Sequence, residues 1–228
     1  GMLGKRLAGF QHTINDNVAD RAKIENGNSK LLYGEPKIVE KIAGLEFEIS
    51  MESFFQTNPV CAEHLYAKAM DYAFEDNNSD KWMMDLFCGT GTIAQLMSQH
   101  SPKAKIIGVD IVQEAIRDAK LNAKRNGIDT IDFHAADVGK FLKEYPEYNG
   151  KIGTIMLDPP RAGIAPKTLK KVMELGAERI IYISCNPSTQ ARDAETLQEF
   201  CYEMKKMTLV DQFPHTSHVE AVAWFEKK

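Results

Sequence analysis

Cys185 is the residue in this sequence whose type and position most directly suggest covalent chemistry. It follows the apolar run RIIYIS at residues 179–184 and precedes the polar, proline-broken segment NPST at 186–189. A buried structural cysteine would lie further back, inside the apolar run. Ligands of α/β sheets bind beyond the carboxyl ends of the strands, and a thiol of lowered pKa in such a place is nucleophilic. Cys185 is therefore a candidate nucleophile, and an inert loop thiol is the alternative.

A second pattern, DLFCGTGT at residues 85–92, joins an apolar run to a helical one. Gly89 and Gly91 would allow a tight turn and a close approach of the backbone to a ligand. Asp110 ends the next apolar run, where its carboxylate could accept hydrogen bonds from ribose hydroxyls. The combination predicts a ligand that contains adenosine, either NAD or S-adenosylmethionine. A ligand-free turn, and a helix N-cap at Asp110, are the alternatives.

Two further acids end apolar runs. Asp137 follows IDFHAA and suits an adenine amino group, or else the capping of the next helix. Asp158 begins DPPRAG, in which two prolines fix φ and remove two backbone donors, so a rigid turn is expected. A dehydrogenase has no obvious use for this loop, whereas methyltransferases that act on nucleic acids place an acidic or amide residue before Pro-Pro. The loop therefore favours S-adenosylmethionine over NAD.

These residues can act together only in a fold that places the carboxyl ends of several strands side by side, and the pattern from residue 51 onward predicts such a fold. Strand-like runs alternate with helical patterns, which predicts an α/β fold with a doubly wound, mostly parallel sheet of about seven strands. The expected strands lie at residues 82–87, 105–111, 131–137, 152–160, 179–185, 208–214 and 219–227. The last two are joined by too few residues for a helical crossover, so the last strand is expected to be antiparallel.

Residues 1–50 carry a different pattern. They are polar and weakly periodic up to about residue 30, and then show short strand-like runs broken at residues 34–36 and at Gly44. We interpret 1–50 as an N-terminal extension, the remnant of a preceding domain with short β strands, or as an extension laid on the main one. Residues 51–228 are interpreted as the catalytic domain.

Composition excludes several classes of protein. The chain has 228 residues, 43% of them hydrophobic and 26% charged, as in ordinary globular proteins. A net charge of −4 gives no global basic field, so RNA binding would need a local patch. The four cysteines form no C-x-x-C pair, which predicts neither a zinc site nor a disulfide framework but the reduced thiols of a cytoplasmic or nuclear protein. Three of them are interpreted as structural: Cys61 and Cys201 within helices, and Cys88 in the glycine loop.

Six segments, in order, resemble the RNA uracil-C5 methyltransferases, the S-adenosylmethionine-dependent enzymes that make 5-methyluridine in tRNA and rRNA. They are SFFQTN (53–58), DLFCGTGT, GVDIV, LDPPRAG, YISCNPST and DQFPHTSHVE (211–220). The resemblance covers roughly residues 30–228 and implies a Rossmann-like class I methyltransferase fold. It implies RNA as the partner. No apolar run approaches the roughly 20 residues of a membrane span, so no membrane is expected, and a monomer is the default expectation.

The resemblance also assigns roles. It implies that the cofactor S-adenosyl-L-methionine is contacted by Gln56, Phe87, Thr92, Asp110, Asp137 and Asp158, to which the turn argument adds Gly89. Cys185 becomes the nucleophile and Glu220 the base. Family members often have glutamate where Asp110 stands, and the shorter acid is expected to serve. Local sequence alone would make Glu220 an ordinary exposed residue, and His215 and His218 hydrogen-bonding loop residues, so no metal is expected.

The implied chemistry is covalent. C5 of uracil is a poor nucleophile, and addition of a thiolate to C6 makes it reactive. A base then removes the C5 proton and the thiolate leaves. A uridine in stacked RNA must be presented outside the stack, and Phe54 and Phe55 are candidates for stacking on it, with core packing as the alternative.

Three rival functions remain open from the sequence. They are a methyltransferase for another atom, a non-catalytic RNA-binding or folding factor that keeps the fold, and an NAD-dependent oxidoreductase. Methyltransferases for another atom usually have an aromatic residue after Pro-Pro, where this sequence has Arg161. An NAD-dependent oxidoreductase needs a set of hydride-transfer residues, and no such set is recognisable in this sequence. tRNA is favoured over rRNA because no iron–sulfur cysteine cluster is present in the sequence.

Overall fold

The structure is a computed structural model that describes residues 7–14, 29–50, 55–75 and 81–228. The elements are β1 (Gly9–Thr13), β2 (Ser29–Gly34), β3 (Lys37–Ile42), β4 (Leu45–Ser50), α1 (Pro59–Phe74), β5 (Trp82–Leu86), α2 (Thr92–His100), β6 (Ile106–Asp110), α3 (Gln113–Arg125), β7 (Ile131–Ala135), α4 (Val138–Glu144), the short 3-10 helix η2 (Pro146–Tyr148), β8 (Ile152–Leu157), α5 (Pro166–Glu174), β9 (Arg179–Ser184), α6 (Pro187–Glu199), β10 (Tyr202–Val210) and β11 (Glu220–Lys227). Of the helices described, none combines the length and apolar character that a membrane span requires.

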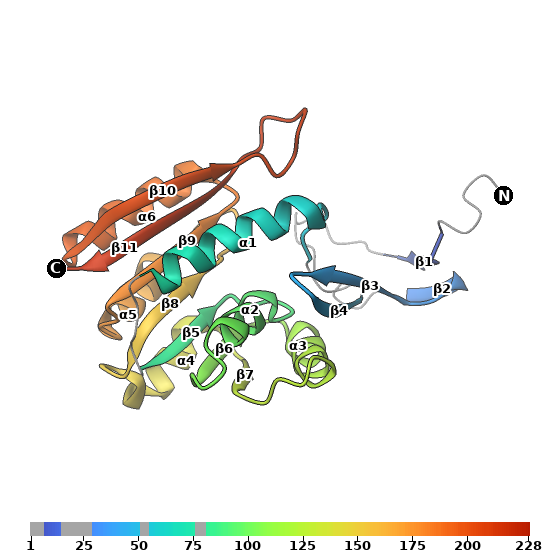
Figure 1. Cartoon of the computed structure of the whole chain (residues 1–228), viewed down its shortest axis with the longest axis horizontal. Helices are drawn as coiled ribbons and strands as arrows, with labels where there is room; N and C mark the ends of the chain where they lie inside the picture. The colour runs from blue at the N-terminus through green and yellow to red at the C-terminus, as the bar shows by residue number, and fades with distance from the viewer. Residues whose placement is uncertain (1–6, 15–28, 51–54, 76–80) are drawn as a thin grey trace.

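A seven-stranded sheet forms the centre of the molecule, in the order β10-β11-β9-β8-β5-β6-β7 (Figure 1). The strands β5 to β9 run parallel, and β11 is antiparallel to both of its neighbours. This confirms the doubly wound, mostly parallel sheet of seven strands with an antiparallel last strand. The last strand lies inside the sheet, between β9 and β10, so β10 forms the edge.

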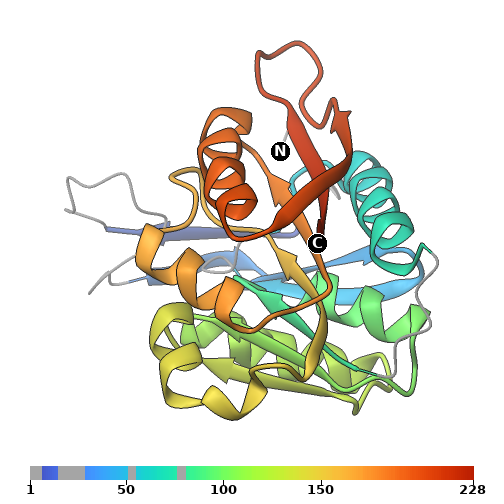
Figure 2. The same ribbon diagram turned by 90° about the vertical axis from the view of Figure 1, so that its left-hand side faces the viewer.

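Helices cover both faces of the sheet because successive strand residues point to opposite sides. Met83 packs with α1, α2 and α3 on one face, whereas Met84 packs with α4, α5 and α6 on the other. The same alternation recurs at Ile181 and Ile180 in β9. Figure 2 shows α1 on one side of the strands and α6 on the other. Burial on both faces is the reason these strands are continuously apolar.

The β3–β4 hairpin belongs to the α1–α3 face. Four of its side chains are buried in the same core cluster as these helices: Ile42, Leu45, Phe47 and Ile49. Asn122 of α3 and Asn126, the C-cap residue of that helix, hydrogen-bond to the backbone of Glu48 and Glu46, respectively, at 2.8–3.0 Å. The strand-like runs predicted on either side of Gly44 are confirmed, and they pair as a hairpin. A domain boundary at residue 50 stays a prediction, and this packing ties residues 37–50 to the core.

Three details of the sequence prediction were wrong. Residues 9–13, in the polar segment for which no strand was predicted, form β1, which pairs with β2 in a two-stranded ribbon of its own. β10 ends at Val210, before most of the segment expected to form it, because its pairing with β11 runs from Tyr202 to Val210. Cys201 lies after α6 in a turn with φ +66°, so it is not within a helix.

The glycine loop after β5 is packed tightly against β7. Gly91 has φ +74°, and a Cβ there would lie 2.6 Å from the Phe133 ring. A Cβ at Gly108 of β6 would meet the same ring at 2.5 Å. Phe133 therefore fills the space that two glycines leave open, and it supports the loop from the β7 side.

Replacing Gly91 with alanine should cost more stability than replacing Gly150, although their φ values are alike, +74° and +77°. A Cβ at Gly150 meets no atom within 4 Å, so only the left-handed backbone penalty of about 1–2 kcal/mol applies. At Gly91 the displacement of Phe133 adds about 1–3 kcal/mol. Urea-induced unfolding of both variants measures the difference, and equal losses would contradict this steric explanation.

Candidate active site

The carboxyl ends of β5 and β8 lie at a topological switch point of the sheet, where the chain leaves two adjacent strands in opposite directions. β5 leads to its neighbour β6 on one side, whereas β8 leads to β9 on the other. Ligands of α/β proteins bind at such switch points. The glycine loop follows β5 and Asp158 follows β8, so the fold brings both predicted ligand-binding loops to this point.

Cys185 follows β9 at the same edge, and Glu220 is brought beside it by β11. Because β11 runs antiparallel to β9, its first residue meets the last residues of β9. Ala221 pairs with Ser184 in the register, and one step beyond this pair lie Glu220 and Cys185. Cys185 and Glu220, which are 35 positions apart in the sequence, are thus adjacent at the strand ends.

The surroundings of Cys185 determine its ionisation. Burial raises the pKa of the thiol, and the nearby charges of Glu220 and Asp158 raise it further, because negative charges disfavour a thiolate. The Arg161 guanidinium acts in the opposite direction. These surroundings oppose the lowered pKa that a nucleophilic thiol needs. Arg161 is the group here that favours the nucleophilic form.

Glu220 is a buried carboxyl group, and Asp158 is a partly buried one. Glu220 is only 3% exposed, which excludes the ordinary exposed glutamate that local sequence would suggest. Burial raises its pKa, and Arg161 partly opposes that shift. Burial also raises the pKa of Asp158 well above its ordinary value, and the charges of Glu220 and Asp85 add to the effect. A carboxylate of raised pKa is a stronger base.

The loop after β5 is organised by Asp110. Its Oδ2 accepts a hydrogen bond from Gly89 N–H at 3.0 Å, and its Oδ1 accepts one from Val112 N–H at 2.8 Å. Val112 is the N-cap residue of α3, so Asp110 lies two residues before the N-cap and is not itself the N-cap residue. Phe87 has φ +66°, a conformation uncommon for a bulky residue. Such backbone strain is typical of functional loops.

Thr92 and Asp137 have structural roles at the starts of helices, and their cofactor contacts stay predictions. Thr92 is the first residue of α2, is 6% exposed, and has its hydroxyl 3.3 Å from that of Thr90. Asp137 is the exposed N-cap of α4 and accepts a hydrogen bond from Lys140 N–H at 2.9 Å. This is the capping role that the sequence left open. The other carboxylate oxygen of Asp137, Oδ2, has no partner in the described hydrogen bonds, and a contact of Asp137 with adenine stays a prediction.

Gln56 belongs to a buried group of side chains that the sequence analysis missed. Gln212 Nε2 donates to Gln56 Oε1 at 3.4 Å and to the Asn58 carbonyl at 3.1 Å. Asn58 Nδ2 donates in return to the Gln212 carbonyl at 3.1 Å, and Tyr66 hydrogen-bonds to Gln56. These bonds tie the loop after β10 to the start of α1. Gln212 falls inside the DQFPHTSHVE segment, so a signal for it was present.

Asp85 is the second residue that was missed. It is fully buried in β5, where Oδ2 accepts a hydrogen bond from Ala94 N–H at 2.8 Å and Oδ1 has no partner among the described residues. Burial raises its pKa to about 7, the Ala94 N–H opposes the shift and Asp110 adds to it. An acid within the apolar run WMMDLF is the signal, because burying a carboxyl group is costly and such groups cluster at functional sites.

The remaining sequence candidates contribute less. Phe55 packs on Phe47 with ring centroids 5.7 Å apart, as the core alternative expected, and Phe54 lies outside the described residues. Within the described ranges, no three His, Cys, Asp or Glu side chains are placed to share a metal ion.

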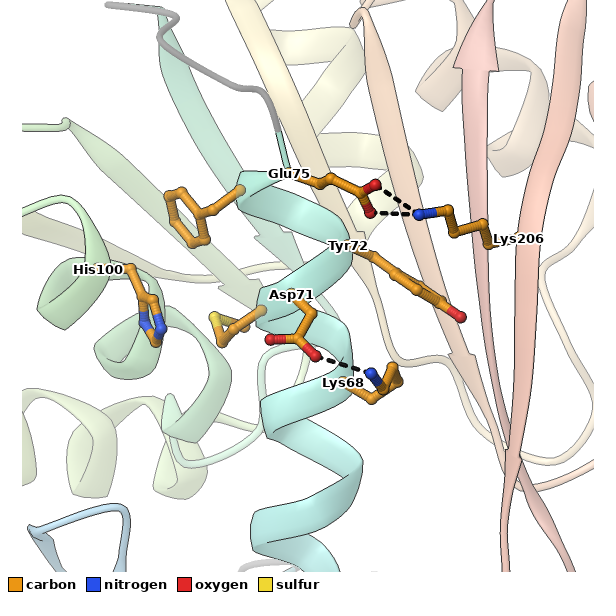
Figure 3. Close-up of a pocket in the computed structure, with 8 residues that line it drawn as sticks. Lys68, Asp71, Tyr72, Glu75, His100 and Lys206 are labelled. Atoms are coloured by element: carbon orange, nitrogen blue, oxygen red, sulfur yellow. Dashed lines mark hydrogen bonds and ion pairs between the residues drawn. The ribbon is translucent and has the colours of Figure 1, made fainter.

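A surface pocket of about 490 Å³ lies beside the carboxyl-terminal end of α1, away from the strand ends that carry Cys185 and Glu220 (Figure 3). Residues of this helix end line the pocket, together with His100 and Lys206. Arg179, at the start of β9, caps the same helix end by donating hydrogen bonds to the carbonyls of Tyr72 and Glu75 at 2.9 and 2.6 Å. The pocket contains none of the predicted site residues. Its lysines are paired with Asp71 and Glu75, so its charges are already balanced.

Comparison with known proteins gives consistent results. The family model described as tRNA (Uracil-5-)-methyltransferase matches residues 28–228. An uncharacterized RNA methyltransferase of Clostridium acetobutylicum is 42% identical over 222 residues, which are 97% of this chain and 47% of the relative. One of Caldanaerobacter subterraneus matches with the same identity and coverage. The chain thus spans about half the length of the curated relatives it matches.

A solved structure extends the comparison. The crystal structure of Pyrococcus abyssi tRNA (uracil-54, C5)-methyltransferase in complex with S-adenosyl-L-homocysteine is similar, with a TM-score of 0.75 and 29% identity. The match covers 96% of this chain and 50% of that one.

Replacing Asp85 with asparagine should raise stability at pH 8. The folded pKa, about 7, exceeds the ordinary value of 3.8, so the folded state binds more protons and the free energy of unfolding falls as pH rises between these values. Asparagine keeps an acceptor for Ala94 and does not ionise, so the gain at pH 8 should be about 2–4 kcal/mol and should nearly vanish at pH 4.

Chemical denaturation at both pH values measures this effect. Asp129, exposed in the loop before β7, is the matched control, because its change to asparagine should alter stability little at either pH. A gain at Asp85 of the same size at both pH values would contradict the assigned ionisation.

Proposed function

Because the chain belongs to the tRNA (uracil-5-)-methyltransferase family, we propose that it transfers a methyl group from S-adenosylmethionine to C5 of a uridine in RNA. The observation that supports this most is the pairing of Ala221 with Ser184, which sets Glu220 beside Cys185. tRNA is the favoured RNA, since the family description and the Pyrococcus abyssi relative both refer to tRNA.

The loop after β5 fits S-adenosylmethionine. Each carboxylate oxygen of Asp110 accepts only one backbone N–H, so each keeps an acceptor site for a ribose hydroxyl. A Cβ built on Gly89 meets no atom within 4 Å, so the backbone is open to a ligand there. Asp85, whose Oδ1 is unpartnered among the described residues, and the partly buried Asp158 offer carboxyl oxygens here, and a bound cation would favour their ionised forms. When bound, the cofactor supplies an electrophilic methyl group on positively charged sulfur.

In the proposed reaction Cys185 acts first. Its thiolate adds to C6 of the uracil, and the electron pair of the C5–C6 double bond moves to C5 and the C4 carbonyl. C5 thereby becomes nucleophilic enough to accept the methyl group. The nearby Arg161 guanidinium favours the thiolate against the effect of burial. The same cation can balance the negative charge that passes from sulfur to the base.

Glu220 then acts as the base. Its carboxylate removes the proton left on C5 after methylation, the C5–C6 double bond re-forms, and the thiolate leaves C6. Burial raises the pKa of Glu220, which increases its affinity for that proton. Its position opposite Cys185, one step beyond the Ala221–Ser184 pair, puts acid–base and nucleophilic groups at the same strand end.

RNA containing 5-fluorouridine should trap a covalent adduct in the presence of S-adenosylmethionine, because fluorine at C5 cannot leave as a proton. The expected result is a band of reduced mobility on a denaturing gel, absent in Cys185→Ala. Cys61→Ala is the matched control, since Cys61 is a partly buried thiol of α1 and its loss should leave the band unchanged. A band that persists in Cys185→Ala would overturn the assigned nucleophile.

Asp110→Asn should weaken binding of S-adenosylhomocysteine by about 10-fold or more, because hydrogen bonds from ribose to a charged acceptor are worth about 1.5–3 kcal/mol. Isothermal titration calorimetry measures the effect without RNA. Asp129→Asn serves again as the exposed control and should bind as the unmodified protein does. Equal affinity for Asp110→Asn and Asp129→Asn would remove Asp110 from the proposed cofactor site.

A further inference from the structure

Helix α6 holds the loop that follows Asp158 by its backbone. Asn186 Nδ2 and Thr189 Oγ1 each donate a hydrogen bond to the Arg161 carbonyl at 3.1 Å. Arg192, one turn further along the helix, donates to the Ala162 carbonyl at 3.0 Å. The helix begins two residues after Cys185, so one element is attached both to the candidate nucleophile and to this loop.

Asp193 completes this attachment from a buried position. It is 2% exposed, and its Oδ2 accepts hydrogen bonds from Ile164 N–H at 2.8 Å and from the Tyr182 hydroxyl at 2.7 Å. Its Oδ1 accepts a hydrogen bond from Arg192 at 2.7 Å. A buried carboxylate is tolerated when several donors satisfy it. The mechanism proposed above gives it no role in contact with substrate.

Gly163 lets the loop approach the helix this closely. It has φ +74°, and a Cβ there would lie 2.5 Å from Arg192 Nη2 and 2.7 Å from Asp193 Oδ2. Only a residue without a side chain fits between the loop and these two groups. The loop backbone from Arg161 to Ile164 is therefore fixed at both ends against α6.

The fixed loop has a consequence for Cys185. The groups that influence this thiol are Glu220 on β11, Asp158 after β8, and Arg161 in the fixed loop itself. Two of them are carboxyl groups, and Arg161 is the cation. The side chain of Arg161 is long and exposed, so its effect depends on where the loop backbone places it.

We propose that Asp193 is a positioning residue which, through Ile164 N–H and the Tyr182 hydroxyl, holds the loop so that Arg161 lies beside Cys185 and Glu220. This inference rests on the proposed function, in which Cys185 is the nucleophile. Loss of the attachment lets Arg161 move away from the thiol, and the two carboxyl groups then dominate its surroundings. Reactivity of Cys185 should fall although Asp193 contacts no reacting atom.

The test measures alkylation of Cys185 by iodoacetamide as a function of pH, in the whole chain without RNA or cofactor. Trypsin releases the thiol in the peptide IIYISCNPSTQAR, residues 180–192, which contains no other cysteine, so mass spectrometry reports this site alone. Asp193→Asn and the milder Tyr182→Phe should move the midpoint of the profile upward by about half a pH unit, equivalent to about threefold less thiolate below it.

Tyr202→Phe is the matched control. Tyr202 is also a buried tyrosine of the α4–α6 face, and its hydroxyl donates to the Ala177 carbonyl at 2.8 Å, away from the loop. This variant should lose similar stability and keep the profile of the unmodified protein. Arg161→Gln should reproduce the upward shift, and combining it with Tyr182→Phe should add nothing, because both act through the same cation.

Each outcome decides the proposal. An unchanged profile in Tyr182→Phe, an equal shift in Tyr202→Phe, or additive shifts in the Arg161→Gln and Tyr182→Phe pair would overturn it. If Asp193→Asn does not fold, Tyr182→Phe carries the test. Absence of a 5-fluorouridine adduct in the unmodified protein would contradict the proposed function, whereas the alkylation profile would still report on the loop.

Discussion

The candidate site depends on the antiparallel insertion of β11 between β9 and β10. A parallel strand would have its first residue at the amino edge of the sheet, far from the ends of β9. Because β11 runs in the opposite direction, its first residue, Glu220, lies where β9 ends, and the register of Ala221 with Ser184 sets it beside Cys185. Backbone pairing therefore joins a thiol and a carboxyl group from distant parts of the sequence.

The same strand ends gather three carboxyl groups that are shielded, fully or partly, from water. Asp85, Asp158 and Glu220 all have raised pKa values, chiefly because burial disfavours their ionised forms. This arrangement costs stability in the free protein and is suited to a cationic ligand, which would relieve the repulsion. Arg161 is the counter-charge supplied by the chain, and its loop is fixed to α6 rather than left free. Stability and function are thus opposed at this edge, as is common for active sites.

Local patterns determined most of the fold. The alternation of apolar runs with helical patterns predicted the parallel sheet, and the short connection before the last run predicted its reversal. The prediction failed where polarity concealed a strand: β1 is polar along much of its length and forms only because β2 pairs with it. It also failed near Val210, since the end of β10 is set by its partner β11 and not by its own composition.

The sequence by itself determined which residues could do chemistry: Cys185 at the end of an apolar run, the glycine loop, and acids at strand ends. Residue type and local spacing suffice for such choices. Only the tertiary structure decided how these groups act on one another. The pKa of Cys185, the burial of Glu220, and the contacts of Asp193 with Tyr182 and Ile164 depend on distances between segments far apart in the chain. Electrostatic and hydrogen-bond interactions are set by those distances, which no local pattern contains.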